Sequence, residues 1–381
     1  MVSSNANALG IIFPNSYDSL VPELVSERLM ASIPFASRYR MIDFLLSSMV
    51  NSGITNISMI LRQNYRSLMD HLGSGREWDL TRKNGGLNII PPFSEKSIKV
   101  YRGRVEALAN ILPLLRSSKE KYVVMADAHI AANVPFDDVI AAHKQSGADI
   151  TVVYYKADLH ERTESLRKLN GDYYYTLQID ENQRINEVHI NAQDIGIQNH
   201  SMNIYVVNRE FLITQIEDAN VRGKIYFERD VLLPNLDKYY VNAYEFTGYV
   251  AFLDSLKSYF DENMALLKME NSDALFDGNP IYTKVRDDNP TRYTPTARVK
   301  NVMAADGCVI EGTVENCVLF RGVKVAKGAV VKNCILMQDT IIAENTTAEY
   351  LITDKNVTIT AHQEIRGTAS YPMYIAKRKI V

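Results

Sequence analysis

The chain has 381 residues, of which 46% are hydrophobic, and a formal net charge of −3 at pH 7 with a pI near 6.2. This length exceeds one ordinary domain, and the composition is that of a globular protein that buries a full core. The charge favours neither nucleic acid nor an anionic membrane as a partner. Since no apolar run approaches the roughly 20 residues of a membrane span and residues 1–8 lack the features of a signal peptide, we expect a cytoplasmic protein.

Short β-branched runs alternate with helical stretches through roughly the first 290 residues. The expected strands are Leu9–Phe13, Ile57–Leu61, Tyr122–Met125, Ile150–Tyr155 and Asn203–Val207. The expected helices are Leu45–Ser52, Val105–Leu115 and Val139–Ser146. Because strands that are apolar throughout suit a sheet covered on both faces, this pattern predicts a mainly parallel, Rossmann-like α/β domain. Ligands of such sheets bind beyond the carboxyl ends of the strands.

The pattern changes after about Pro295, where apolar residues recur every six positions. One such series is Cys317, Val323, Ala329, Ile335 and Ile341. A strict period of six predicts a left-handed parallel β-helix of hexapeptide repeats, whereas an antiparallel sandwich would alternate by two. We therefore expect an α/β domain over residues 1–286, a linker over 287–297 and a β-helix over 298–381. The three cysteines all fall in the β-helix and are expected to be buried and unpaired.

Several long segments of the chain resemble glucose-1-phosphate adenylyltransferases, in the order that this family shows. They are PFASRYRMIDFLLSSMVNSGI (Pro34–Ile54), HLGSGREWDL (His71–Leu80), YRG (Tyr101–Gly103), GADITVV (Gly147–Val153) and SMNIYVV (Ser201–Val207). The resemblance implies a nucleotidyltransferase-like domain followed by a hexapeptide β-helix. It also implies the family's reaction, in which ATP and glucose 1-phosphate give ADP-glucose and pyrophosphate with Mg²⁺ in bacterial glycogen synthesis.

Phosphoryl transfer of this kind depends on positioning the substrates and on neutralising charge with Mg²⁺ and cationic side chains. The family places a glycine-rich loop with an arginine after the first strand, so that backbone N–H groups can approach the triphosphate. Here the corresponding residues are Asn15-Ser16-Tyr17-Asp18-Ser19-Leu20. No glycine is present, Leu20 replaces the arginine, and Asp18 adds a negative charge.

Four further positions of the family's site have also lost the expected residue type. Met30 replaces a lysine that contacts phosphate, and Asn191 replaces the lysine that holds the sugar phosphate. His129 and Phe252 replace the two carboxylates that bind the metal, and a phenyl ring offers no oxygen donor. A slip of two residues would instead supply Asp127, which shares a strand face with His129.

These losses make the chain similar to the regulatory, catalytically impaired subunits of the family, the GlgD type. The resemblance implies that this chain alone binds no metal or cofactor, while its active partner requires Mg²⁺. That partner is a catalytic GlgC-type subunit in a hetero-oligomer, expected to be a heterotetramer. A sugar-phosphate effector is expected between the two domains, and the matching basic residues are Arg28, Arg40, Lys377 and Arg378.

Other interpretations remain open at this point. The chain could be a slow but genuine adenylyltransferase that uses Asp127. A hexapeptide acyltransferase would need a catalytic histidine on the β-helix, where only His362 is available. Arg40 could simply pair with Asp43 or a backbone carbonyl, and Lys377 and Arg378 could be solvated tail charges.

Overall fold

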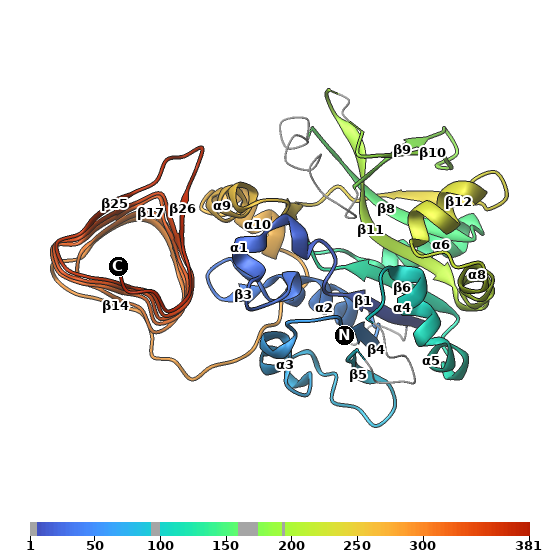
Figure 1. Cartoon of the computed structure of the whole chain (residues 1–381), viewed down its shortest axis with the longest axis horizontal. Helices are drawn as coiled ribbons and strands as arrows, with labels where there is room; N and C mark the ends of the chain where they lie inside the picture. The colour runs from blue at the N-terminus through green and yellow to red at the C-terminus, as the bar shows by residue number, and fades with distance from the viewer. Residues whose placement is uncertain (1–5, 93–99, 159–173, 193–194) are drawn as a thin grey trace.

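The computed structural model describes residues 6–92, 100–158, 174–192 and 195–381, which form an α/β domain and a three-sided β-helix (Figure 1). The α/β domain is built on a nine-stranded sheet in which β10-β9-β11-β6-β1-β4-β5 follow one another, while β8 pairs with β11 and β12. Its strands are β1 (Ala8–Phe13), β4 (Asn56–Ile60), β5 (Gly86–Ile90), β6 (Tyr122–Asp127), β8 (Ile150–Ala157), β9 (Tyr175–Ile179), β10 (Ile185–Ile190), β11 (Gln198–Asn208) and β12 (Val241–Glu245).

All the expected strands form, and most of the sheet around β1 is parallel. β1 pairs in parallel with β4 and β6, and β4 with β5. β11 runs antiparallel to β6 and β8, and β9 and β10 continue the antiparallel part. The domain is therefore built on a mainly parallel sheet in which β11 and β10 run opposite to the other strands, and β12 pairs in parallel with β8.

Helices cover both faces of this sheet, which explains why its central strands are apolar throughout. α2 (Met41–Asn51), α3 (Arg66–Leu72) and α6 (Phe136–Ser146) pack on one face. α4 (Arg104–Asn110), α5 (Leu112–Ser117) and α8 (Arg209–Val221) pack on the other. The single helix expected over Val105–Leu115 is two helices that meet at Ile111, because Pro113 can only occupy a first helical turn.

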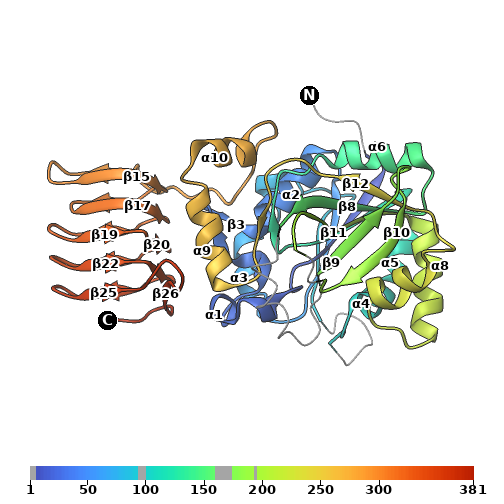
Figure 2. The same cartoon turned by 90° about the horizontal axis from the view of Figure 1, so that it is seen from above.

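The β-helix consists of stacked coils, as Figure 2 shows. Its strands pair in parallel, and the outward positions Thr313, Val330, Thr347 and Glu364 lie above one another at a constant interval. The strands are β14 (Arg292–Tyr293), β15 (Arg298–Ala304), β16 (Val309–Ile310), β17 (Thr313–Leu319), β18 (Lys324–Val325), β19 (Val330–Lys332), β20 (Ile335–Leu336), β21 (Ile341–Ile342), β22 (Thr347–Glu349), β23 (Leu351–Thr353), β24 (Thr358–Ile359), β25 (Glu364–Arg366) and β26 (Met373–Ile375).

Inside the coils, short apolar side chains fill the core, and Cys308, Cys317 and Cys334 are buried and unpaired there, as expected.

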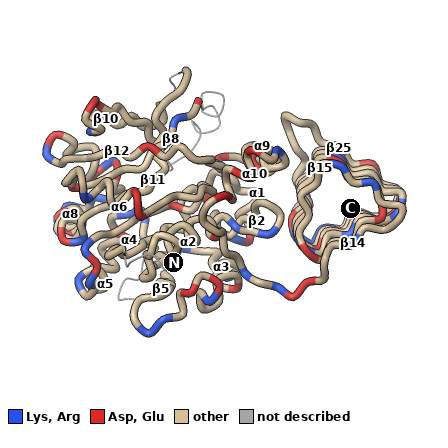
Figure 3. The backbone as a smooth tube through the Cα atoms, turned by 180° about the vertical axis from the view of Figure 1, so that it is seen from behind, with Lys and Arg blue, Asp and Glu red and all other residues tan. Residues whose placement is uncertain are grey.

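β14 lies within the range expected to be linker, yet it already pairs with β16 of the first coil. The segment between α10 (Met269–Phe276) and β14 carries basic residues followed by acidic ones (Figure 3). No described helix is both long and apolar enough to cross a membrane.

An apolar interface joins the two domains. α9 (Leu256–Ala265) contributes Tyr259 and Phe260, and the β-helix contributes a face that includes Val318, Ile335 and Ile352. The same cluster contains Leu20 and Met30, from the segment that follows β1 and includes the short α1 (Pro22–Val25). The β-helix is thus packed against the segment that carries two of the predicted degenerate positions.

Candidate functional site

The loop after β1 lies at the carboxyl end of the parallel strands, where Phe13 of β1 pairs with Asp127 of β6. Ser16 Oγ donates a hydrogen bond to Asp127 Oδ1 at 2.7 Å. Asn15 Nδ2 donates to Asp18 Oδ2 at 2.8 Å, and the Met30 N–H donates to Asp18 Oδ1 at 2.7 Å. The polar groups of this loop are therefore bonded to the protein itself, in a position where a nucleotide-binding loop would present them to phosphate.

Aromatic rings meet at the two positions that were predicted to have lost the metal carboxylates. β13 (Ala251–Phe252) pairs with β7 (Ile130–Ala131), and the rings of Phe252 and His129 lie 5.3 Å apart between centroids. The Tyr17 ring packs on His129 at 4.3 Å. Burial lowers the pKa of His129 to about 4, so its imidazole is neutral at pH 7. The structure thus brings His129 and Phe252 together, in a contact that supplies no oxygen ligand.

Asp127, the alternative metal carboxylate, is fully engaged by donors from the protein. Arg104 Nη2 donates to Asp127 Oδ2 at 2.9 Å, while Ser16 bonds the other oxygen. The buried Arg104 also pairs with Glu228 and lies 4.8 Å from the centroid of the Phe13 ring. Among the described residues, no three His, Cys, Asp or Glu side chains gather where they could hold a metal. The residues at this site therefore do not fit the Mg²⁺ that the family's reaction needs.

A cavity of about 610 Å³ opens beside this loop, which is a size that can hold a nucleotide-sized ligand. Its walls include three carboxylates, Asp18, Asp127 and Glu228. Of the three arginines that line it, Arg104 is neutralised by Asp127 and Glu228, Arg102 is paired with Glu106, and Arg62 lies over the Tyr101 ring. This balance of charge opposes the binding of a triphosphate.

The remaining degenerate positions present no cation to the cavity. Leu20 is 7% exposed and Met30 is completely buried in the apolar interdomain cluster. Asn191 follows β10 and forms two hydrogen bonds with Tyr174, through its backbone N–H and its side-chain oxygen. These three side chains therefore serve packing and local backbone geometry.

A second pocket, of about 170 Å³, lies between the α/β domain and the β-helix. Its walls come from several separate segments and bring six basic side chains together. They are Arg38, Arg40, Lys284, Arg286, Arg321 and Lys355, and the nearby Asp70 is the one carboxylate among the lining residues. Such a concentration of positive charge is suited to an anion with several oxygen acceptors.

Burial and mutual repulsion disfavour the charged forms of these groups. Burial lowers the pKa of Lys355 to about 7, and the neighbouring Arg40 and Arg28 add to the effect. Burial likewise lowers the pKa of Arg40 to about 10 and shifts that of Arg321 downward. Arg321 is 8% exposed, and its Nε has no hydrogen-bond partner among the described residues. A bound anion would relieve this repulsion and satisfy that donor.

Of the four predicted effector residues, only Arg40 lines the interdomain pocket. Its Nη1 also donates to the Ser67 carbonyl at 2.6 Å, while its backbone N–H bonds Asp43. Arg28 is buried against Asp354, Lys377 pairs with Glu27 at 2.7 Å, and Arg378 is exposed at a corner of the last coil. The expected tail residues thus contact the α/β domain or solvent and do not face the pocket.

The other basic residues of the pocket were not predicted, although a signal for them exists. Arg38 and Arg40, and likewise Lys284 and Arg286, stand two residues apart, which places both members of a pair on one side of an extended chain. Arg321 and Lys355 precede Gly322 and Asn356, two left-handed turn residues on the same β-helix corner. Recognising the pocket from sequence would have required knowing which corner of the β-helix faces the α/β domain.

The HLGSGREWDL loop is fixed by buried contacts next to this pocket. His71 Nε2 lies 2.6 Å from Asp43 Oδ1, and the Trp78 ring packs beside His71. Thr283 Oγ1 also donates to Asp43, at 2.6 Å. Asp43 thus joins α2, this loop and the start of the connection to the β-helix.

Comparisons with known proteins agree with this architecture. A nucleotidyl transferase family matches residues 23–164, and a GlmU-like C-terminal hexapeptide family matches residues 285–369. The glycogen biosynthesis protein GlgD of Bacillus subtilis (strain 168) is 34% identical over 375 residues, which covers 98% of this chain and 96% of that protein. The protein of the same name from Geobacillus stearothermophilus is 35% identical over 86% of this chain and 83% of its own length.

Proteins named glucose-1-phosphate adenylyltransferase are also similar. The one from Geobacillus stearothermophilus is 30% identical over 329 residues, covering 85% of this chain and 83% of that protein. The similarity spans both domains, and the degenerate loop, the sheet and the β-helix follow one another as the resemblance in the sequence implied. The chain therefore belongs to the glucose-1-phosphate adenylyltransferase family and, within it, to the GlgD-type glycogen biosynthesis proteins.

Proposed function

We propose that this chain is a regulatory, catalytically impaired subunit of ADP-glucose pyrophosphorylase in glycogen biosynthesis. It raises the activity of a catalytic, GlgC-type glucose-1-phosphate adenylyltransferase with which it forms a heterotetramer. The observation that carries the proposal is the contact between the His129 and Phe252 rings at the two positions of the family's metal carboxylates. The names of the similar proteins support a role in glycogen biosynthesis.

The chemistry available to this chain supports little turnover of its own. Removing one transition-state cation from a phosphoryl-transfer site costs on the order of 10³–10⁵ in rate. Leu20, Met30 and Asn191 each stand where the family has such a cation. The alternative, a slow enzyme that uses Asp127, would have to break the bonds from Ser16 and Arg104 before that carboxylate could bind metal. Mg²⁺ is required by the active partner, and the described residues of this chain gather no set of ligands for it.

The interdomain pocket supports the binding of a sugar-phosphate effector. A phosphate group would be met by Arg40, Arg321 and Lys355, and Arg38 extends the positive surface, while Arg286 is paired with Asp288. Because these side chains come from both domains, an anion that binds them favours one interdomain arrangement over others. A coupling of roughly 1–3 kcal/mol to the partner's conformational equilibrium is sufficient for regulation.

The test is ADP-glucose synthesis from ATP and glucose 1-phosphate by this chain alone, by the catalytic chain alone, and by the two mixed. We expect no turnover from this chain, and a higher kcat or a lower KM in the mixture than for the catalytic chain. Unchanged kinetics on mixing would overturn the regulatory proposal. Mg²⁺-dependent turnover by this chain that is lost in Asp127→Ala would instead establish the slow enzyme.

A further inference from the structure

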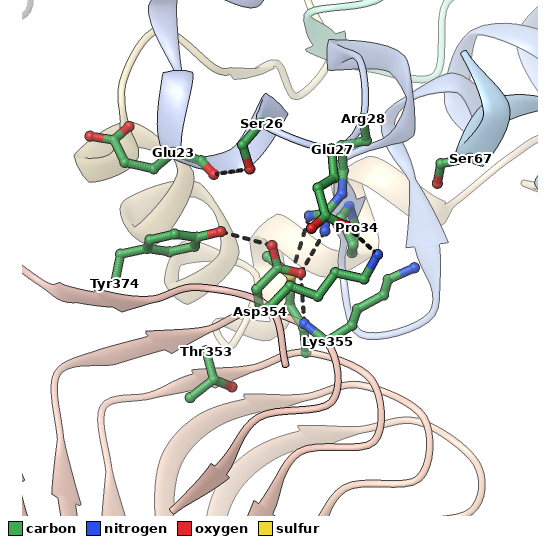
Figure 4. A network of polar contacts seen from close by, with 12 residues as sticks. Glu23, Ser26, Glu27, Arg28, Pro34, Ser67, Thr353, Asp354, Lys355 and Tyr374 are labelled. Carbon is green, nitrogen blue, oxygen red and sulfur yellow. Dashed lines mark hydrogen bonds and ion pairs between the residues drawn. The ribbon is translucent and has the colours of Figure 1, made fainter. Parts of the chain in front are cut away.

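A buried ion pair between Arg28 and Asp354 joins the two domains (Figure 4). It belongs to the charged interdomain cluster, by which we mean Arg28, Asp354, Lys355 and the basic residues of the interdomain pocket. Arg28 Nη2 lies 2.5 Å from Asp354 Oδ1, and both side chains are at most 3% exposed. The Tyr374 hydroxyl donates to Asp354 Oδ2 at 2.7 Å, and the Lys355 N–H donates to Oδ1 at 2.6 Å. The Asp354 carboxylate is therefore held by donors on both oxygens, as a bound oxyanion is held in a protein site.

The surroundings of Asp354 carry more positive than negative charge. Burial lowers the pKa of the neighbouring Lys355, the positive charges of Arg40, Arg28 and Lys377 lower it further, and the negative charge of Asp354 raises it. Lys377 is paired with Glu27. Without the Asp354 carboxylate, Arg28 and Lys355 would stay buried without the carboxylate that now opposes their charge.

The ion pair also connects the β-helix to the degenerate loop of the α/β domain. Arg28 lies two residues before Met30, whose N–H is bonded to Asp18. Asp354 and Tyr374 belong to the last coils of the β-helix, and the Asp354 N–H donates to the Ile375 carbonyl. The ion pair of Arg28 with Asp354 therefore attaches the loop after β1 to the β-helix.

We propose that Asp354 is a built-in anion that fills an inner oxyanion site of the interdomain cluster and holds the domain joint together. A diffusible anion can then reach only the outer pocket, lined by Arg38, Arg40, Arg321 and Lys355. The ion pair lies within one chain and goes beyond the proposed regulation of a partner. The role of Asp354 can therefore be tested without measuring activation of that partner. Removing the carboxylate converts the inner site into one that binds inorganic phosphate or sulfate.

The experiment measures the thermal unfolding temperature of the full chain from 0 to 50 mM inorganic phosphate at constant ionic strength. Asp354→Ala vacates the space of the carboxylate, and we expect its Tm to lie below that of the wild type without phosphate. Phosphate should then raise its Tm by about 4 °C more than it raises that of the wild type. Cleavage of the 285–291 segment by trypsin should become slower in the same titration.

Two matched variants separate this effect from general stabilisation by anions. Asp354→Asn keeps the volume of the side chain and should gain no more from phosphate than the wild type does. The double variant Arg28→Ala/Asp354→Ala lacks the cation and should lose the additional gain. The proposal is overturned if Asp354→Ala shows no additional gain, or if the double variant gains as much. If Asp354→Ala is recovered folded only in phosphate or sulfate, the proposal is supported, and if it stays unfolded in both it is refuted.

Discussion

Replacing Lys355 tests the electrostatics of the interdomain pocket. Its pKa of about 7 means that the free protein is half charged at this position at pH 7 and about 1% charged at pH 9. A bound phosphate dianion stabilises the ammonium and raises this pKa again, so binding takes up a proton above pH 7. Affinity should consequently fall as the pH rises, by roughly 50-fold between pH 7 and pH 9 if the anion binds only the charged form.

Isothermal titration calorimetry with glucose 6-phosphate between pH 7 and pH 9 measures this dependence. The second phosphate pKa lies near 6, so the ligand stays almost entirely doubly charged over this range. The calorimeter also reports the proton uptake, because the observed enthalpy then varies with the ionisation enthalpy of the buffer. In Lys355→Met we expect weaker binding at pH 7 and a nearly flat dependence on pH.

Lys284→Met is the matched control, because Lys284 lines the same pocket but is exposed and bonded to the Asp70 carbonyl. This variant should bind the ligand more weakly and keep the pH dependence of the wild type. An equal loss of affinity with pH in Lys355→Met and in the wild type would refute the assignment of the titration to Lys355. The effect would then have to come from another group in the cluster.

Three further changes test the degenerate site. Arg104→Met leaves Asp127 and Glu228 buried without their cation and should lower the unfolding free energy by about 3–5 kcal/mol in urea, whereas the exposed Arg102→Met should barely move the midpoint. His129 has a folded-state pKa of about 4 against 6.5 unfolded, so the stability that it contributes is present above pH 6.5 and is lost as the pH falls toward 4. His129→Phe should therefore flatten the acid side of the Tm profile, which thermal unfolding over a series of pH values measures. Phe252→Asp buries a carboxylate against aromatic rings and should lower Tm. It should not create ADP-glucose synthesis, because Leu20, Met30 and Asn191 still supply no cation. Mg²⁺-dependent turnover by this variant would contradict the description of the site.

The fold was largely predictable because its strongest signals are periodic. The period of six in the C-terminal part reflects coils with one short strand on each of three sides. Equivalent residues of successive coils lie 17 positions apart, so the series shifts by one residue per coil, and Ile341 is exposed. Strand direction was harder to predict. Ile150–Tyr155 and Asn203–Val207 are apolar because both faces of the sheet are covered, and this pattern is the same for a parallel and an antiparallel strand. The antiparallel placement of β11 between β6 and β8 therefore depends on connections that the apolar pattern does not encode.

The degenerate positions were placed by register, and the structure brings two of them, His129 and Phe252, into contact. The residues that contact the site in the folded chain, such as Tyr17 and Arg104, could not be predicted from the sequence register. Tyr17 reaches His129 from a left-handed backbone conformation, with φ of 66°, which is uncommon for a residue with a side chain. Arg104 was not singled out, because its role depends on the distance to Asp127 and Glu228 across the folded site.

The two sites differ in whether their charges are satisfied by the protein, and this difference indicates what each site still binds. In the site at the carboxyl ends of the strands, Asp18, Asp127 and Arg104 bond to neighbouring groups, so no ligand is needed to offset their burial. In the interdomain pocket, the buried Arg321 Nε has no hydrogen-bond partner among the described residues. The pKa of Lys355 is lowered to about 7, so its amine is only partly protonated at pH 7. Unpaired buried cations lower stability unless a ligand relieves them, and proteins accept such a cost mainly at functional sites. We therefore infer that internal bonds satisfy the charged groups of the first site, whereas the basic pocket between the two domains is the better candidate for binding an anion.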